Sequence, residues 1–182
     1  MRLATPRLTL LAATARHMGA DLEGPAALAG ALGVDVPDAW PPDLYDHDAI
    51  RYSLAMLENP ANEGWTFYYV ILNEPTPTLI GLAGYKGRPG DDGTVEIGYG
   101  ILAAYQRRGY ASEAAAELVA NAFRCPAVRR VIAETLPDLA ASKGVLRRNG
   151  FSFVGDGSEP GVIRYALERA EYERQRAVPL AG

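Results

Sequence analysis

The residues best suited to chemistry lie in the segment Gln106-Arg107-Arg108-Gly109-Tyr110-Ala111. An alternating apolar stretch, 94–101, precedes it and an Ala/Glu/Leu-rich run, 111–123, follows it, so the segment has the character of a basic turn between a strand and a helix. Backbone N–H groups at the start of a helix, at the positive end of its dipole, bind anions. The turn therefore predicts a site for a pyrophosphate, and hence for a cosubstrate with a nucleotide tail.

Side chains that could serve as metal ligands or as a thiol nucleophile are few and scattered. Cys125 is the single cysteine, so a multi-thiolate metal site and an internal disulfide framework are both excluded. His17 and His47 lie far from the turn in sequence with no second ligand beside them, and we interpret both as structural or surface residues. Asp91-Asp92-Gly93 lacks the remaining ligands of a calcium loop. The sequence predicts no metal site.

The composition limits the size of the protein and its classes of partner. With 182 residues, 48% of them hydrophobic and 22% charged, the chain is long enough for one well-buried core and too short for two. A formal net charge of −4 disfavours nonspecific binding to nucleic acid or to an anionic membrane, since both require a basic surface. The sequence has no run of about 18 apolar residues and no N-terminal signal segment, and one cysteine fits a reducing compartment. We expect one cytoplasmic domain that binds a small molecule or a cationic group.

The elements that carry the turn follow from hydrophobic periodicity and from the positions of Gly and Pro. Expected strands cover 7–11, 65–72, 79–86, 94–101, 130–135, 151–155 and 162–167. Expected helices cover the segment between a cap at Thr14 and a stop at Gly24, then 25–32 closed by Gly33, about 46 or 48 to 58, 111–123 and 140–149, and a polar tail rich in Glu and Arg starts at about 169. A Pro-rich loop, 35–43, carries Trp40. The order predicts an α/β fold with helices flanking one central, mixed and mostly antiparallel sheet.

These motifs, taken in order, resemble the GNAT superfamily of acyl-CoA-dependent N-acetyltransferases and, within it, the RimJ/RimL-like branch. The family's cofactor signature, Gln/Arg-x-x-Gly-x-Gly/Ala, stands here as residues 106–111. Glu96-Ile97-Gly98-Tyr99 resembles the branch's fourth strand, and Ser112-Glu113-Ala114 resembles its helix start. Thr5-Pro6-Arg7-Leu8 resembles the usual Thr-x-Arg-Leu of the first strand, and 142–151 looks like the segment ending in Val-Leu-x-x-x-Gly-Phe. The match spans most of the chain, which predicts a single domain over residues 1–182.

The resemblance implies acetyl-CoA as cosubstrate and assigns its contacts. In this family the strand before the signature carries a bulge and splays from its neighbour, so that free backbone groups pair with the pantetheine arm, and Gly98 and Gly100 would permit this irregularity. The pantetheine arm would contact Tyr99, Gly100, Ile101 and Leu102. Gly109 would leave room for a phosphate and two arginines would add positive charge, although arginines beside a turn are also common as solvated surface charges. The implied pyrophosphate contacts are Gln106, Arg107, Arg108, Gly109, Tyr110 and Ala111.

The resemblance also implies catalytic roles. Glu96 stands beside the expected thioester and is the candidate general base, acting through water, although a carboxylate in a half-exposed strand is commonly only a polar surface group. Many relatives use a Tyr four residues before the Gly-Phe pair as general acid, and Leu146 occupies that position here. Ser142 is the substitute candidate, both as acid and as cofactor contact. The family's Asn three residues before this Ser is Leu139.

The function implied is transfer of an acetyl group from acetyl-CoA to a primary amine, on a small molecule or on a protein or peptide N-terminus, by direct attack on the thioester. A non-catalytic acyl-CoA-binding or sensing module is the alternative, because Leu139 and Leu146 depart from the pattern. Trp40 and Tyr99 are the candidate acceptor contacts, and core packing is the alternative role of each. A P-loop phosphotransferase is excluded because no Gly-x4-Gly-Lys-Ser/Thr segment occurs. The sequence leaves a homodimer open.

Overall fold

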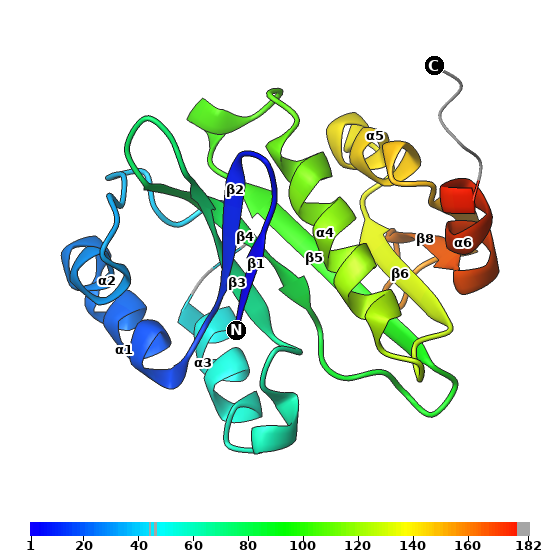
Figure 1. The fold of residues 1–182 in the computed structure, drawn as a ribbon, viewed down its shortest axis with the longest axis horizontal. Coiled ribbons are helices and arrows are strands. Elements are labelled where there is room, and N and C mark those ends of the chain that lie inside the picture. The colour runs from blue at the N-terminus through cyan, green and yellow to red at the C-terminus, as the bar shows by residue number, and fades with distance from the viewer. Residues whose placement is uncertain (44, 46, 178–182) are drawn as a thin grey trace.

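A mixed sheet runs through the molecule and carries helices on both faces (Figure 1). The computed structural model describes residues 1–43, 45 and 47–177. Among these residues, eight strands join in the order β1-β2-β3-β4-β5-β6-β8-β7. Their bounds are β1 (Arg2–Ala4), β2 (Leu8–Ala12), β3 (Phe67–Leu72), β4 (Thr78–Tyr85), β5 (Thr94–Ile101), β6 (Arg130–Thr135), β7 (Ser152–Asp156) and β8 (Ile163–Glu168). The helices are α1 (Ala15–Glu23), α2 (Pro25–Leu32), α3 (His47–Met56), α4 (Tyr110–Arg124), α5 (Ala140–Arg148) and α6 (Arg169–Ala177), with 3-10 turns η1 (Pro60–Asn62) and η2 (Ala103–Tyr105). The predicted α/β class and mixed, mostly antiparallel sheet are confirmed.

The single parallel pairing among the described strands joins β5 to β6, and it is short. It places Thr94 and Glu96 opposite Arg130 and Ile132. Beyond Glu96, β5 continues beside β4 as far as Ile101, while β6 continues beside β8. The 97–101 edge of β5 therefore has no strand partner on the side of β6 among the described residues, so its backbone groups on that side are available to a ligand. The splay that the sequence predicts is present.

The predicted bulge is absent from the pairing of β5 with β4. The register runs without a shift from Tyr85 opposite Ile97 to Gly81 opposite Ile101. A register shift instead interrupts the pairing of β3 with β4: Val70 lies opposite Gly81 and Ile71 opposite Leu79. β5 stays regular because β4 pairs with it along the same stretch where β6 is missing. The opening in the sheet therefore comes from the departure of β6.

The two faces of the sheet bury separate apolar clusters, because successive side chains of a strand point to opposite faces. In β3, Tyr68 packs in the cluster that contains Leu118 of α4 and Leu146 of α5. The next residue, Tyr69, packs in the cluster that contains residues of the first three helices, namely Met18, Leu28 and Ile50. Helices α4 and α5 thus cover one face and α1, α2 and α3 the other (Figure 1).

The two ends of the described chain differ from the sequence prediction. β1 is too short to show a recognisable alternation, and it forms by pairing with β2, where Leu3 lies opposite Leu10. The polar segment from about 169, predicted as a tail, folds as α6. It is held at its start because Arg169 donates to the backbone carbonyls of Phe123, Cys125 and Val128.

The remaining predicted helices and strands are present with small shifts of their ends. α3 begins at His47. Asp46, one of the two predicted starting points of that helix, lies outside the described residues. In the described part of the chain, no helix is long and apolar enough to cross a membrane.

Candidate active site

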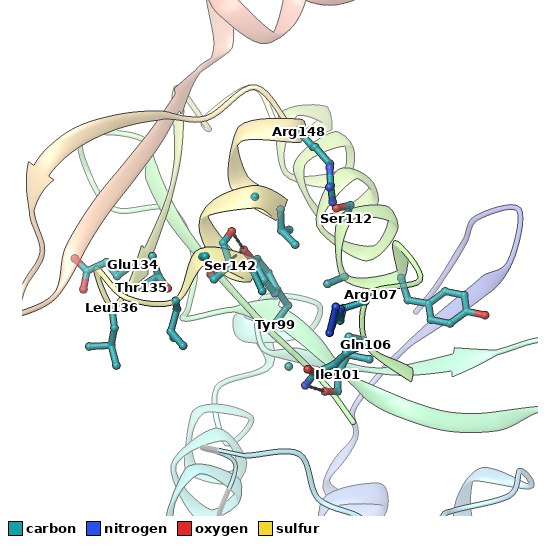
Figure 2. Close-up of a pocket in the computed structure, with 18 of the residues that line it drawn as sticks. Tyr99, Ile101, Gln106, Arg107, Ser112, Glu134, Thr135, Leu136, Ser142 and Arg148 are labelled. Atoms are coloured by element: carbon teal, nitrogen blue, oxygen red, sulfur yellow. Dashed lines mark hydrogen bonds between the residues drawn. The ribbon is translucent and has the colours of Figure 1, made fainter. Parts of the chain in front are cut away.

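A cavity of about 820 Å³ lies beside the partnerless edge of β5 (Figure 2). Its walls come from β5, from the turn and first residues of α4, from the end of β6 and from α5. Most of the predicted cofactor residues line it: Tyr99, Gly100, Ile101, Gln106, Arg107, Gly109, Tyr110, Ala111 and Ser142. Two predicted contacts do not. Leu102 is buried and its N–H donates to the carbonyl of Ile80 at 2.9 Å, and the guanidinium of Arg108 lies over the ring of Tyr105.

The turn before α4 has the backbone shape of an anion-binding loop. Arg107 and Gly109 both adopt left-handed conformations, with φ of +62° and +84°. A positive φ is uncommon for a residue with a side chain, and such strain is concentrated at functional sites. Within the described residues, the N–H groups of Arg107, Arg108 and Gly109 donate to no protein acceptor, and Gly109 caps α4 without a side-chain hydrogen bond. These donors can hold an anion at the start of the helix.

Two further polar groups line this cavity that the sequence did not predict as site residues. The Oγ of Ser112, in the first turn of α4, is buried and has no hydrogen-bond partner among the described residues. Arg148, at the end of α5, lines the same cavity, and its side chain extends toward Ser112 (Figure 2). A buried hydroxyl without a partner costs free energy unless a ligand satisfies it. The position of Ser112 three residues after Gly109 was the available signal, whereas nothing in the sequence places Arg148 beside it.

Tyr99 and Ser142 form the polar centre of the cavity. The hydroxyl of Tyr99 lies 3.3 Å from the Oγ of Ser142 and donates to the Ser142 carbonyl at 3.2 Å. Burial raises the pKa of Tyr99 to about 12, and the contact with Ser142 lowers it by a smaller amount. The tyrosine therefore keeps its proton at neutral pH. The structure thus brings together two predicted site residues, and it leaves Tyr99 with its hydroxyl proton at the wall of the cavity.

Glu96 and Lys86 form an ion pair across β5 and the end of β4. The N–H of Lys86 also donates to the carbonyl of Glu96 at 2.9 Å. The Oε1 of Glu96 is buried and makes no well-oriented hydrogen bond. Its contact with the Lys86 ammonium is therefore an ion pair alone. Lys86 lines the cavity but Glu96 does not, although Glu96 alternates with Gly98 and Gly100 on the same face of β5. No motif in the sequence singles out Lys86.

A second cavity of about 370 Å³ lies on the other side of β5, against α3. Lys86, Tyr99 and Gly100 line both cavities, so the two meet at these residues. The second cavity is mainly aromatic and apolar, and its walls include Tyr45, Tyr52, Met56, Phe67, Leu82 and Tyr85. Among the described residues, no group of three or more His, Cys, Asp and Glu side chains is placed to hold a metal ion.

Comparison with protein families identifies this arrangement. Residues 12–152 match the model of the acetyltransferase (GNAT) domain. The chain belongs to the GNAT family. It is therefore an acetyltransferase, and membership of the family implies acetyl-CoA as the acetyl donor. The family predicted from the sequence motifs is confirmed.

Individual relatives of this GNAT chain are distant. It is 29% identical to the uncharacterized N-acetyltransferase YjdG of Bacillus subtilis over 121 residues, which are 66% of this chain and 71% of that protein. A GNAT-family acetyltransferase from Bordetella pertussis is 26% identical, with a TM-score of 0.61 over 93% of this chain and 99% of that chain. RimL, a ribosomal L7/L12 alpha-N-protein acetyltransferase solved with coenzyme A, is 21% identical, with a TM-score of 0.65 over 92% and 98% of the two chains. At that identity the likeness to RimL shows the fold alone.

Two positions of this GNAT chain depart from the family pattern, and the structure gives them different surroundings. Leu146 is completely buried among the core residues between α5 and the sheet. Leu139 is 42% exposed and lines the first cavity. The first substitution therefore adds to the core, and the second gives the cavity an apolar wall.

Trp40 is a core residue in this GNAT fold. It is 6% exposed, packs in the cluster under the first three helices and lines neither cavity. Its Nε1 donates to the carboxylate of Asp21 at 2.8 Å, and Asp21 also accepts from Tyr69 and Tyr45. The structure supports core packing, the alternative role of Trp40, over contact with the acceptor. The sequence pointed to Trp40 because an aromatic residue in a Pro-rich loop has the same pattern whether it faces a ligand or the core.

Proposed function

We propose that this GNAT protein transfers the acetyl group of acetyl-CoA to the primary amine of a small molecule that carries an apolar or aromatic group. The observation that carries the proposal is the meeting of two unlike cavities at Lys86, Tyr99 and Gly100. One cavity has anion donors and the other has aromatic walls. A cosubstrate in the first and an amine in the second would meet at the unpaired edge of β5.

The residues of the first cavity suit the phosphates of acetyl-CoA. Several donors here lack a protein acceptor and can bind an anion. They are the N–H groups from Arg107 to Gly109, at the start of α4, and the hydroxyl of Ser112. Arg107 and Arg148 add positive charge from two different elements. The 97–101 edge of β5 can pair with the amide groups of the pantetheine arm.

The chemistry needs a free amine held close to the thioester carbonyl. Glu96 accepts a proton from the ammonium through water, and the nitrogen then attacks the carbonyl carbon as the carbon–sulfur bond breaks. Tyr99, kept protonated by burial and coupled to Ser142, donates a proton to the departing sulfur and regains one as the attacking nitrogen loses its second proton. The products are an N-acetyl amine and the free thiol of CoA. Because a thiol has a reference pKa of about 8.5, this last proton transfer assists but is not essential.

The acceptor is proposed from the second cavity. Its volume of about 370 Å³ lies near the lower end of the range for small-molecule sites. Aromatic walls from Tyr45, Tyr52 and Phe67 suit a ring or a branched aliphatic group. Asp43 at the same cavity and the net negative charge of the chain favour a cationic partner.

A thiol-release assay with a panel of amines tests the proposal. The panel contains an arylalkyl amine, a linear polyamine and a short peptide with a free N-terminus, each with acetyl-CoA and a thiol-detecting reagent. We expect the highest kcat/KM for the arylalkyl amine. Preference for the peptide would make its N-terminus the acceptor, and binding of CoA without thiol release from any amine would contradict catalysis.

A further inference from the structure

The N-terminal hairpin is fastened to the start of α4 by a cluster of polar contacts. Glu113, in the first turn of α4, accepts hydrogen bonds from the Thr5 hydroxyl at 2.6 Å, from the Arg7 N–H at 2.9 Å and from the Arg7 Nε at 2.6 Å. Arg7 also donates through Nη1 to the carbonyl of Arg108 at 3.0 Å. Its guanidinium lies 4.6 Å from the centre of the Tyr110 ring. Figure 1 shows the tip of the β1–β2 hairpin beside the start of α4.

These contacts act on the turn from outside the cavity. Neither Arg7 nor Glu113 lines the first cavity, whereas Arg107 and Gly109, on either side of Arg108, do. A carbonyl fixed by Arg7 fixes the peptide unit between Arg108 and Gly109, and that unit also carries the Gly109 N–H. Arg7 therefore holds in place a donor of the anion-binding loop without touching the anion.

The charges in this cluster favour one arrangement. A cation at the start of a helix is disfavoured by the helix dipole, so Arg7 requires a nearby anion to stay there. Glu113 supplies it with a carboxylate that is only 15% exposed. Although burial raises the pKa of Glu113, the hydrogen bonds from Thr5 and Arg7 and the Arg7 charge bring that pKa below its ordinary value. Glu113 is thus ionised at neutral pH and Arg7 keeps its partner.

We propose that Arg7 and Glu113 are positioning residues for the cosubstrate's pyrophosphate: they lock the Arg108–Gly109 peptide so that the N–H groups of the turn point at the phosphates. The inference rests on the proposed function in taking acetyl-CoA as the ligand. The proposal predicts that loss of either residue weakens binding of the nucleotide half of the cosubstrate. Binding of the pantetheine arm should stay unchanged, because that arm contacts β5 instead. A contact that merely fastens the hairpin would affect stability and have no effect on this selectivity.

The test measures binding of CoA and of pantetheine, which lacks the pyrophosphate and nucleotide, by calorimetry at 25 °C. The proteins are wild type, Arg7→Lys, Glu113→Gln and the double variant. Lysine keeps the charge but loses the planar fork that reaches Glu113 and the Arg108 carbonyl together. We expect each single variant to weaken CoA binding by about tenfold, with pantetheine binding unchanged, and the double variant to resemble the single ones because the pair acts as a unit.

A matched control is Arg130→Lys. Arg130 donates through Nε to Glu168 at 2.6 Å, the same donor atom and distance as for Arg7 with Glu113, on strands that do not border the phosphate turn. We expect the control to bind both ligands like wild type. Equal loss of CoA and pantetheine binding in the Arg7 and Glu113 variants, or lower thermal stability with unchanged CoA binding, would overturn the positioning role. Failure of the wild type to bind CoA would instead contradict the proposed function.

Discussion

Lys86 and Glu96 face each other across the end of β4 and the start of the unpaired edge of β5, joined by a backbone hydrogen bond of 2.9 Å and a side-chain ion pair. Lys86 reaches both cavities, and Glu96 stands behind it with a side chain that is 20% exposed. The carboxylate is therefore close to the junction of the cavities while an ammonium group shields it.

The first prediction concerns the general base. Glu96→Gln keeps the size of the side chain and removes its ability to accept a proton, so kcat/KM for the amine should fall by about 10²-fold near neutral pH. The loss should shrink as pH rises, because free amine becomes abundant. A pH–rate profile of both proteins measures this, with Glu168→Gln, in the exposed pair with Arg130, as control. An identical profile for wild type and Glu96→Gln would return Glu96 to a structural role.

The second prediction concerns the proton donor. Tyr99→Phe removes the hydroxyl beside Ser142 and keeps the ring, so kcat should fall by roughly tenfold or more with little change in CoA binding. The loss should be smaller for an acetyl thioester of a more acidic thiol, whose sulfur leaves without a proton. Since the pKa of Tyr99 is raised to about 12, the wild-type rate should show no loss from its ionisation up to about pH 10.

A control for that variant is Tyr68→Phe. The Tyr68 hydroxyl is also buried, and it donates to the Gly64 carbonyl at 2.9 Å outside both cavities. Tyr68→Phe should lower thermal stability and leave kcat unchanged. If Tyr99→Phe loses the same fraction of the rate with every leaving thiol, the proton-donor role of Tyr99 is contradicted.

The third prediction concerns the acceptor cavity. A Cβ added at Gly98 meets nothing within 4 Å, and Gly98 lines only the second of the two cavities. Gly98→Val should therefore fold normally and bind CoA, yet raise the KM for the amine by about tenfold because the new methyl groups occupy the acceptor's space. Steady-state kinetics and CoA calorimetry measure the two effects. Unchanged amine kinetics would place the acceptor elsewhere.

The fourth prediction concerns the phosphate turn. Gly109→Ala forces a side chain into φ of +84° at a cost of about 1–2 kcal/mol, and its Cβ would lie 3.3 Å from Nη2 of Arg7. CoA binding should weaken strongly. Gly33→Ala, at φ of +69° with nothing within 4 Å, carries the same strain at the end of α2. That control should lose comparable stability and keep CoA binding. Equal CoA binding in the two variants would contradict the phosphate assignment.

The fifth prediction concerns pH and stability. Burial raises the pKa of Asp21, and hydrogen bonds from Trp40, Tyr69 and Tyr45 oppose that rise without cancelling it. The folded state therefore binds this proton more tightly than the unfolded state does. Asp21 contributes most to stability below its unfolded pKa of about 3.9, and the contribution is lost as pH rises through the raised folded value.

Asp21→Asn is uncharged at every pH and should remove that loss. Urea unfolding from about pH 4 to pH 7 should show the free energy of unfolding of Asp21→Asn gaining on wild type as pH rises. Asp92→Asn is the opposite control, since hydrogen bonds from Thr94 lower the pKa of the exposed Asp92. A difference between Asp21→Asn and wild type that does not depend on pH would show that folding leaves the pKa of Asp21 unchanged, and would contradict the raised pKa.

Much of the fold and half of the site follow from local sequence. The turn 106–111 could be assigned because Gly109, two arginines and the helix that follows lie within a few residues of one another, and their conformations depend on that local order. The alternation of residues 94–101 likewise predicted the strand that forms β5. The polar segment from 169 was missed as a helix because its stability comes from Arg169, which binds carbonyls more than forty residues away.

The tertiary structure alone decided which distant residues meet. Local periodicity cannot show that β6 leaves β5 after Glu96, that Arg148 approaches Ser112, or that Lys86 joins two cavities, because each depends on how separate elements pack. Trp40 is the clearest case. The sequence around Trp40 suits a ligand contact and a core anchor equally. The carboxylate of Asp21, nineteen residues earlier, holds Trp40 in the core. The sequence therefore determined the family and the turn before α4, and packing determined where the second cavity lies.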